Sequence, residues 1–373
     1  MPTTSLWLEE QHDDLRSVRL DGRAEVAVIG GGVTGCSCAL TLAERGVRVR
    51  LYEAGEIAGG ASGRNGGFAL RGATLPYDRA RDELGPAAAR RVMAFTERSL
   101  LRMEQLAGDA FRRTGSLRLA GDDAERSALQ REHDALEADG FAVEWVEDLE
   151  PPLDGLYQGA IHHPPDGALQ PARWVRRLAS HAVAAGAEIR ERTPVTVDGA
   201  DADVVVVAGD GYTASLLPEL GQALPPTRGQ VLATAPLPEL RYRMPHYARD
   251  GYDYWHQLPD RRLVIGGSRD ASFDTEQTDV LETTTAIQER LDALVERLTG
   301  LRPEVTHRWA GIWGTTPDLM PLVGAVPGRE DVWIAGGYSG HGNALGLACG
   351  DLVARAILGD EPDELPLFDP ARF

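Results

Sequence analysis

A glycine motif near the N-terminus is the first feature of this sequence that could bind a ligand. Gly30, Gly32 and Gly35 form a G-x-G-x-x-G pattern between an apolar strand-like run and an amphipathic helical stretch. Backbone amides at such a helix start bind a pyrophosphate, and the glycines allow its close approach. Glu53 ends the next strand-like run about twenty residues on, where a carboxylate can accept hydrogen bonds from ribose hydroxyls. The alternative is a glycine turn that serves strand–helix packing only.

The carboxylate at position 53 also predicts the kind of dinucleotide. It favours a free ribose 2′-hydroxyl over a 2′-phosphate, which argues against NADP. We expect this first unit to contact the cofactor through Gly30, Gly32, Val33, Thr34, Gly35, Glu53 and Ala54.

Two further glycine-rich segments could approach a large ligand. Loop A, residues 58–68 (AGGASGRNGGF), follows the second strand-like run directly, and Ser62, Arg64 and Asn65 supply donors within it. Loop B, residues 336–343 (GGYSGHGN), precedes the last helical stretch. Glycine permits close backbone approach, and a helix start stabilises negative charge. A flexible surface loop is the alternative for loop A, but its placement directly after a strand argues against it.

Composition limits the class of protein. The chain has 373 residues, of which 43% are hydrophobic and 25% charged, and a formal net charge of −19. These values are typical of a globular protein of about two domains. The negative charge argues against nucleic-acid binding. All 38 Lys+Arg residues are arginine, which excludes a Schiff-base lysine and a Walker-A lysine.

Membrane, metal and disulfide signals are weak. No apolar run approaches the ~20 residues of a membrane span, and the acidic start is unlike a signal peptide. We therefore expect a cytoplasmic protein without stable membrane insertion. Cys36, Cys38 and Cys349 are too few and too poorly spaced for a disulfide framework or a zinc site. We expect them to be reduced packing residues, and we predict no metal site.

The order of elements predicts an α/β fold with a Rossmann-type dinucleotide-binding domain and a discontinuous second domain. Strand-like and helical runs alternate in the βαβ manner near the N-terminus, whereas alternating apolar residues after position 227 predict an antiparallel sheet. Helices are expected at 33–44, 77–106, 122–139, 172–185, 280–298 and 344–358, and strands at 24–29, 47–52, 142–146, 203–209 and 332–335. The expected division is 1–76, 155–226 and 327–373 for the dinucleotide domain, and 77–154 and 227–326 for the antiparallel-sheet substrate domain.

The motifs together resemble FAD-dependent oxidoreductases of the D-amino-acid oxidase superfamily. The likeness covers nearly the whole chain and is carried by SLWL, ASGRNGG, TRGQVLATA, WAGIWGTTPDLMP, GYSGHG and LPLFDPARF. It is strongest to the amine-oxidising branch that includes gamma-glutamylputrescine oxidoreductase. The resemblance implies FAD rather than NAD, with Val195 and Val197 on a strand that meets adenine. It implies further FAD contacts from Ala61, Ser62, Arg64, Asn65, Gly66, Gly67, Ala208, Gly209, Gly311, Gly337, Gly340, His341, Gly342 and Asn343.

Trp313 departs from the family pattern. In D-amino-acid and glycine oxidases the corresponding residue is typically an arginine that binds the substrate carboxylate. An indole has no pair of guanidinium N–H groups to bind a carboxylate. It offers an apolar wall or a cation–π face for an amine instead, which favours amines over α-amino acids. The alternative is that Arg64, Arg249 or Arg269 binds the carboxylate instead.

A second departure concerns the flavin. Gly311 stands where sarcosine oxidases with covalent flavin have a cysteine, so the resemblance implies that FAD is held without a covalent bond. Those oxidases also use a lysine near the flavin in oxygen reduction, and this chain has none. His341 or Arg64 could supply the positive charge instead.

An aromatic strand in the second domain completes the candidate site. Alternation places Tyr252, Tyr254 and His256 on one face and Trp255 on the other, and the resemblance places this strand over the flavin. We name His341, Tyr254 and Trp313 as candidate catalytic residues.

These features predict FAD-dependent oxidative deamination of a primary or secondary amine. Hydride transfer to the flavin would give an imine that hydrolyses to an aldehyde, and oxygen or another acceptor would reoxidise the flavin. One alternative is a D-amino-acid or glycine-type oxidase or dehydrogenase with a relocated carboxylate-binding arginine. Another is a flavin-binding protein with a regulatory or tRNA-related role, although the acidic charge argues against a nucleic-acid partner. The oligomeric state is left open.

Overall fold

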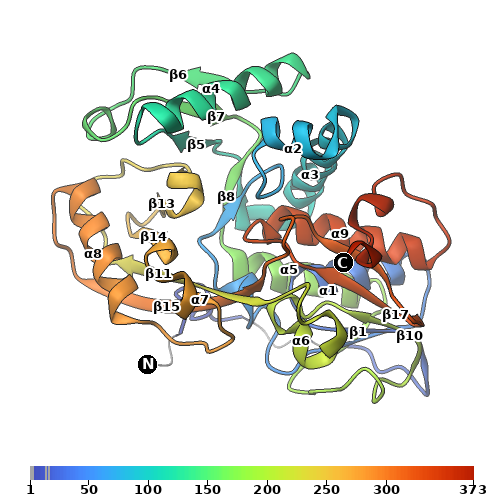
Figure 1. The fold of residues 1–373 in the computed structure, drawn as a ribbon. Coiled ribbons are helices and arrows are strands. Elements are labelled where there is room, and N and C mark those ends of the chain that lie inside the picture. The colour runs from blue at the N-terminus through green and yellow to red at the C-terminus, as the bar shows by residue number, and fades with distance from the viewer. Residues whose placement is uncertain (1–3, 13–14, 16) are drawn as a thin grey trace.

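Two large sheets dominate the computed structural model, which describes residues 4–12, 15 and 17–373 (Figure 1). The longer helices are α1 (Val33–Glu44), α2 (Tyr77–Leu84), α3 (Pro86–Ala107), α4 (Asp123–Ala138), α5 (Pro171–Ala184), α8 (Thr285–Thr299) and α9 (Gly342–Ile357). Two short helices are α6 (Thr213–Leu216) and α7 (Phe273–Glu276). Within the described residues, no helix has the length and apolar character to cross a bilayer.

The first sheet has the strand order β16–β17–β10–β1–β2–β9 and is parallel except at the β16–β17 pair. Its strands are β1 (Ala24–Ile29), β2 (Val49–Tyr52), β9 (Glu188–Arg190), β10 (Ala202–Val207), β16 (Leu322–Val326) and β17 (Arg329–Gly336). Val26 and Val28 of β1 pack into one hydrophobic core, whereas Ala27 and Ile29 pack into another on the opposite face. Burial on both faces explains the nearly continuous apolar runs of these strands.

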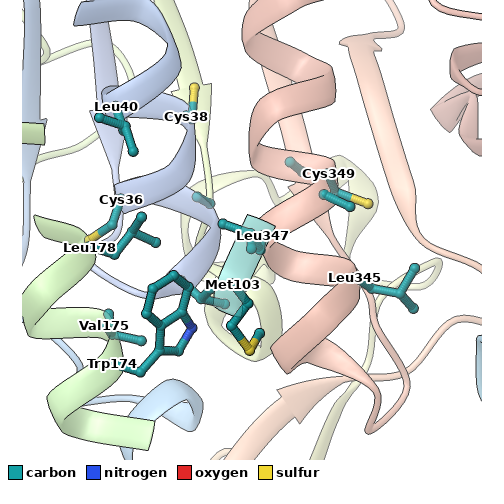
Figure 2. Close-up of a cluster of buried hydrophobic side chains, with 14 of the residues drawn as sticks. Cys36, Cys38, Leu40, Met103, Trp174, Val175, Leu178, Leu345, Leu347 and Cys349 are labelled. Atoms are coloured by element: carbon teal, nitrogen blue, oxygen red, sulfur yellow. The ribbon is translucent and has the colours of Figure 1, made fainter. Parts of the chain in front are cut away.

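Helices α1, α5 and α9 cover one face of this sheet (Figure 1). Helix α9 approaches α1 so closely at Gly350 that a Cβ there would lie only 2.3 Å from the carbonyl oxygen of Thr34. Figure 2 shows Cys36 and Cys38 pointing in different directions from α1, with Cys349 on α9. All three cysteines are buried and free, which confirms that they are packing residues, and burial raises the pKa of their thiols.

The second sheet has the order β15–β11–β14–β13–β12–β5–β7–β6 and is antiparallel except where β12 pairs with β5. Its strands are β5 (Ser116–Leu119), β6 (Glu144–Val146), β7 (Ala160–His163), β11 (Pro226–Thr234), β12 (His246–Ala248), β13 (Asp253–Gln257), β14 (Leu263–Gly267) and β15 (Val305–Gly314). A small sheet of β3 (Phe68–Ala69), β8 (Gly167–Leu169) and β4 (Phe111–Arg112) lies beside loop A. One face of the second sheet packs on α8 through Trp255, Ile265 and Leu291. The predicted fold class is confirmed.

Three predicted elements differ in detail. The helix expected at 77–106 is two helices, because Gly85 has a φ of +85° and Pro86 starts α3, where a missing N–H costs no hydrogen bond. Helix α8 begins at Thr285 rather than Val280. The expected strand around Val195 is wrong: β9 ends at Arg190 and the chain runs irregularly past Pro194, which cannot donate to a strand ladder.

Two elements cross the expected domain division, which remains a prediction. Strand β7 lies between 155 and 226 but pairs with β5 and β6 in the second sheet. Helix α3 falls within 77–154, yet its Phe95 and Met103 are buried in the core that α1 and α9 share. Local sequence patterns do not encode such non-local partners.

Candidate functional site

The turn between β1 and α1 lies against the end of β10. A Cβ on Gly35 would lie 1.9 Å from the carbonyl oxygen of Gly30, and a Cβ on Gly30 would lie 2.5 Å from that of Ala208. The amide of Ala208 donates to Ile29 at 2.8 Å. The structure therefore brings the predicted contacts Ala208 and Gly209 beside the first glycine motif, where the backbone has no room for a side chain.

Glu53 lies over this same turn. Its Oε2 accepts a hydrogen bond from the Gly31 amide at 2.6 Å, and its Oε1 accepts one from the Gly55 amide at 2.7 Å. Ala54 beside it is exposed. The N-cap residue of α1, Gly32, supplies no side-chain cap, so the positive end of the helix can receive an external anion beside the Ser62 hydroxyl, which accepts from the Val33 amide.

Asn65 orders loop A from within. Its Nδ2 donates to the carbonyls of Ala61 and Ser62 at 3.1 and 3.0 Å, and its Oδ1 accepts from the Gly67 amide at 2.8 Å. The Ser62 hydroxyl accepts from the Val33 amide at 3.0 Å. Loop A is thus bound to the first turn of α1, which joins the first two glycine-rich segments.

Loop B is joined to both of these segments. Asn343, at the start of α9, donates from Nδ2 to the carbonyl of Phe68 at 2.6 Å, and its amide contacts that of Asn65 at 3.2 to 3.3 Å. The hydroxyl oxygens of Tyr338 and Thr34 are 2.7 Å apart. The three segments therefore form one continuous site, and Gly337, Gly340, His341 and Gly342 lie in its third part.

His341 lies at the boundary between loop B and the second domain. Its Nδ1 is 2.9 Å from the Thr74 hydroxyl, and it lines a cavity together with Arg118 and Tyr247 of the second sheet. Burial lowers the pKa of His341 to about 4, so the ring is neutral at pH 7. A neutral ring does not favour His341 over Arg64 as the source of the positive charge expected to assist oxygen reduction, and the role of either residue remains a prediction.

Asp210 is a site residue that the sequence analysis missed. Its Oδ1 accepts from the Gly337 amide at 2.8 Å and its Oδ2 accepts from the Gly314 amide at 3.1 Å. Burial raises the pKa of this carboxyl. Asp210 thereby connects the end of β10 to the start of loop B and to the end of β15 beside Trp313. The available signal was an acidic residue directly after a buried strand at the carboxyl edge of a parallel sheet.

The second sheet turns a face of glycines and aromatic rings toward the site. Gly229 pairs with Gly311, and Gly266 pairs with Tyr254. A Cβ on Gly229 would lie 2.4 Å from the Trp313 ring, and one on Gly266 would lie 2.4 Å from the Tyr254 hydroxyl oxygen. Trp313 and Tyr254 therefore lie directly on the backbone of this face, and their catalytic roles remain predictions.

This face meets loop A. A Cβ on Gly66 would lie 2.8 Å from the Tyr254 ring, and one on Gly311 would lie 3.1 Å from the Cβ of Arg64. The indole Nε1 of Trp309 donates to the carbonyl of Arg64 at 2.8 Å. The structure thus brings the predicted residues of loop A and of the second sheet together.

The alternation predicted for four residues around β13 is confirmed for the three that lie in the strand. Tyr254 and His256 both contact Phe68, the last residue of loop A, whereas Trp255 is buried under α8. Tyr252 precedes the strand. Burial raises the pKa of Tyr254 and lowers that of His256 to about 3, so both side chains are neutral at pH 7.

The three arginines considered as carboxylate binders differ in their surroundings. Arg249 pairs with two aspartates, and Arg64 donates from Nε to the backbone of loop A at 2.8 Å. The Arg269 guanidinium lies 5.6 Å from the centre of the Trp313 ring. The cation–π face expected to receive an amine at Trp313 is therefore already occupied by a cation.

The site fits FAD. It offers a helix start whose N-cap residue is a glycine for a pyrophosphate, a carboxylate at the end of β2 for a ribose, and a glycine-lined sheet face for a planar ring system. The nitrogens of His256 and the Nε1 of Trp313 are buried on that face without a partner among the described residues. The assignment of individual residues to FAD contacts remains a prediction.

This chain is similar to several known proteins. A family model described as FAD dependent oxidoreductase (DAO) matches residues 25–356. A probable oxidoreductase OrdL of Rhizobium meliloti (strain 1021) is 30% identical, over 90% of this chain and 83% of that protein. A gamma-glutamylputrescine oxidoreductase of Escherichia coli (strain K12) is 28% identical, over 90% and 84%. The crystal structure of glycine oxidase from Geobacillus kaustophilus has a TM-score of 0.78 at 24% identity, covering 94% of this chain and 99% of that one.

The match to the family extends over the first glycine motif, loop A, the second sheet and loop B, which are the parts that form the site. The resemblance expected from the sequence is therefore confirmed, and so is FAD as the cofactor. This chain belongs to the DAO family of FAD-dependent oxidoreductases.

Proposed function

We propose that the protein oxidises the CH–NH bond of a primary or secondary amine. The observation that carries the proposal is the face formed by Tyr254 and Trp313 opposite loop A, because it places aromatic walls beside the cofactor site. When bound, FAD would supply a hydride acceptor for the carbon next to nitrogen, and water would hydrolyse the resulting imine to an aldehyde and ammonia or an amine. Relatives named for amine and glycine oxidation support a CH–NH substrate.

The protein's own residues orient the amine and exclude water. Tyr254 keeps its hydroxyl proton because burial raises its pKa, so it can donate a hydrogen bond. His341 is held by Thr74 as a neutral ring. A hydride transfer requires a neutral amine rather than a strong side-chain base, which this arrangement satisfies. Oxygen or another acceptor would then take the electrons.

We further propose that FAD is held without a covalent bond. Position 311 is glycine, and its Cα faces Arg64. The three cysteines are buried in α1 and α9, away from this strand. Denaturation should release all of the yellow chromophore into the protein-free filtrate.

The proposed function is tested by the visible spectrum of the purified holoenzyme without oxygen. Addition of substrates from a panel of amines and amino acids should bleach the flavin absorbance, and an aldehyde or keto product should appear in equal amount. Bleaching by dithionite but by no amine or amino acid would overturn the proposal and favour a flavin-binding protein without amine turnover.

The pH dependence of flavin reduction should follow the substrate and not a histidine. Because the pKa of His341 is about 4 and that of His256 about 3, neither ring changes charge between pH 6 and pH 9. The anaerobic reduction rate should rise across this range as the amine loses its proton. Stopped-flow profiles of the wild type and of His341→Asn should share one inflection, and an inflection lost in the variant would contradict this assignment.

A further inference from the structure

Arg269 carries a charge that the described part of the chain does not neutralise. Its guanidinium is half-buried, and no carboxylate among the described residues pairs with it. It contacts three aromatic rings instead: the carbon of the guanidinium lies 5.1 Å from the centre of Tyr252, 5.3 Å from Phe273 and 5.6 Å from Trp313. Partial desolvation of a cation without a counter-ion is unfavourable, so the site is suited to an anion from outside the chain.

The backbone fixes where this guanidinium lies. Strand β14 ends at Gly267, whose φ is +120°, and Ser268 follows with a φ of +57°. A Cβ on Gly267 would lie 2.0 Å from the carbonyl oxygen of Tyr252, so this turn requires glycine. It directs the chain back across the end of the sheet, where Arg269 meets Trp313.

Asp270 and Asp253, which lie on either side of this turn in the sequence, form ion pairs with other arginines. Asp270 follows Arg269 directly but binds the Arg249 guanidinium, which also contacts Asp253 at 3.2 Å. Arg297 contacts Asp253 as well, at 3.4 Å. Arg249 is therefore neutralised within the protein, whereas Arg269 keeps its charge. Of the three arginines considered for a carboxylate, Arg269 is the one held by aromatic rings rather than by a carboxylate or a backbone carbonyl.

We propose that Arg269 is the specificity-determining residue of the substrate site and binds a carboxylate on the amine substrate. The inference rests on the proposed function and names its substrate class: amines that carry a carboxylate, such as amino acids. A guanidinium offers a planar fork that matches a carboxylate in a bidentate arrangement. Trp313 then acts as a positioning residue, because its ring holds the guanidinium in place through a cation–π contact.

The arrangement also determines the orientation of the substrate. With the carboxylate paired to Arg269, the neutral amine end of the substrate lies away from the guanidinium, toward Tyr254. Arg269 is close enough to Tyr254 to influence the pKa of that phenol, so one small molecule can reach both. This reverses the preference for carboxylate-free amines that Trp313 alone predicts.

The test compares matched substrate pairs on the holoenzyme. Glycine, sarcosine, alanine and proline are each paired with the amine that lacks the carboxylate: methylamine, dimethylamine, ethylamine and pyrrolidine. Arg269→Gln should raise the apparent Kd or KM of the carboxylate members about 10- to 100-fold, as expected for loss of a charge-assisted bidentate pair. Rates with the carboxylate-free members should change less than about 2-fold.

A binding readout without turnover complements the kinetics. Benzoate should perturb the visible flavin spectrum of the wild type, and Arg269→Gln should weaken this binding by the same factor. Arg269→Lys, which keeps the charge but not the fork, should fall between the two. The matched control is Arg262→Gln, at the other end of the β13–β14 hairpin, where an exposed pair with Asp260 is removed; it should leave both members of each pair unchanged.

The outcomes separate the two proposals. Equal effects of Arg269→Gln on both members of a pair, or no effect on carboxylates and benzoate, would overturn the role of Arg269 while amine oxidation stands. A wild-type flavin that no amine or amino acid bleaches would overturn the proposed function itself. Benzoate binding that depends on Arg269 in such a protein would still support an anion site.

Discussion

Replacing Gly35 with alanine is expected to abolish FAD binding and to destabilise the fold. The added Cβ would lie 1.9 Å from the carbonyl oxygen of Gly30, and a backbone oxygen in a tight turn cannot rotate away as a side chain can. Overpacking of this kind costs about 3 kcal/mol at the upper end of the usual range. The turn must open to accept the methyl group, which moves the amides that face the pyrophosphate. The purified variant should be colourless, with a lowered melting temperature.

A matched control isolates the steric effect. Gly60 in loop A has a φ of −85°, and no atom lies within 4 Å of the position that a Cβ would take there, so Gly60→Ala should bind FAD as the wild type does. FAD titration by fluorescence quenching and thermal melts with and without FAD measure both variants. A Gly35→Ala protein that is yellow and melts normally would contradict the role of the turn, as would equal losses in both variants.

The sequence predicted the first unit of the fold accurately because its signals are local. The strand at 24–29 and the helix at 33–44 have the predicted bounds, since apolar periodicity and the glycine motif both mark the same boundary. The neighbours of β7 and α3 were not predictable in this way, because strand pairing and helix docking depend on residues far away in the chain.

The sequence predicted which segments form the candidate site, but not the contacts between their side chains. Loop A, loop B and the face of Tyr254 and Trp313 do come together. The contact between Arg269 and Trp313 depends on the register of β11 with β14 and β15 and on the left-handed turn after β14, and neither is encoded by local spacing. Asp210 was missed because a single acid after a strand has no distinctive motif.

Replacing Glu276 with glutamine is expected to cause a larger loss of stability than removal of any exposed charge. Glu276 and Arg228 form a bidentate pair with both bonds at 2.8 Å, and their side chains are 1% and 6% exposed. Gln230 donates to both carboxylate oxygens at 3.0 Å. Removing one partner of a buried pair leaves the other charge uncompensated and costs about 3–5 kcal/mol.

The loss should also affect substrate specificity, because Glu276 ends the short helix α7 that begins at Phe273, one of the rings around Arg269. We expect Glu276→Gln to weaken benzoate binding more than it weakens FAD binding. Urea unfolding of the holoenzyme gives the free energy, and the control is Arg302→Gln, whose pair with Glu296 is 82% and 46% exposed and should contribute little to stability. The double variant Arg228→Met/Glu276→Leu removes both charges and should recover much of the stability. Equal losses in the buried and exposed variants would show that the Arg228–Glu276 pair does not anchor this segment.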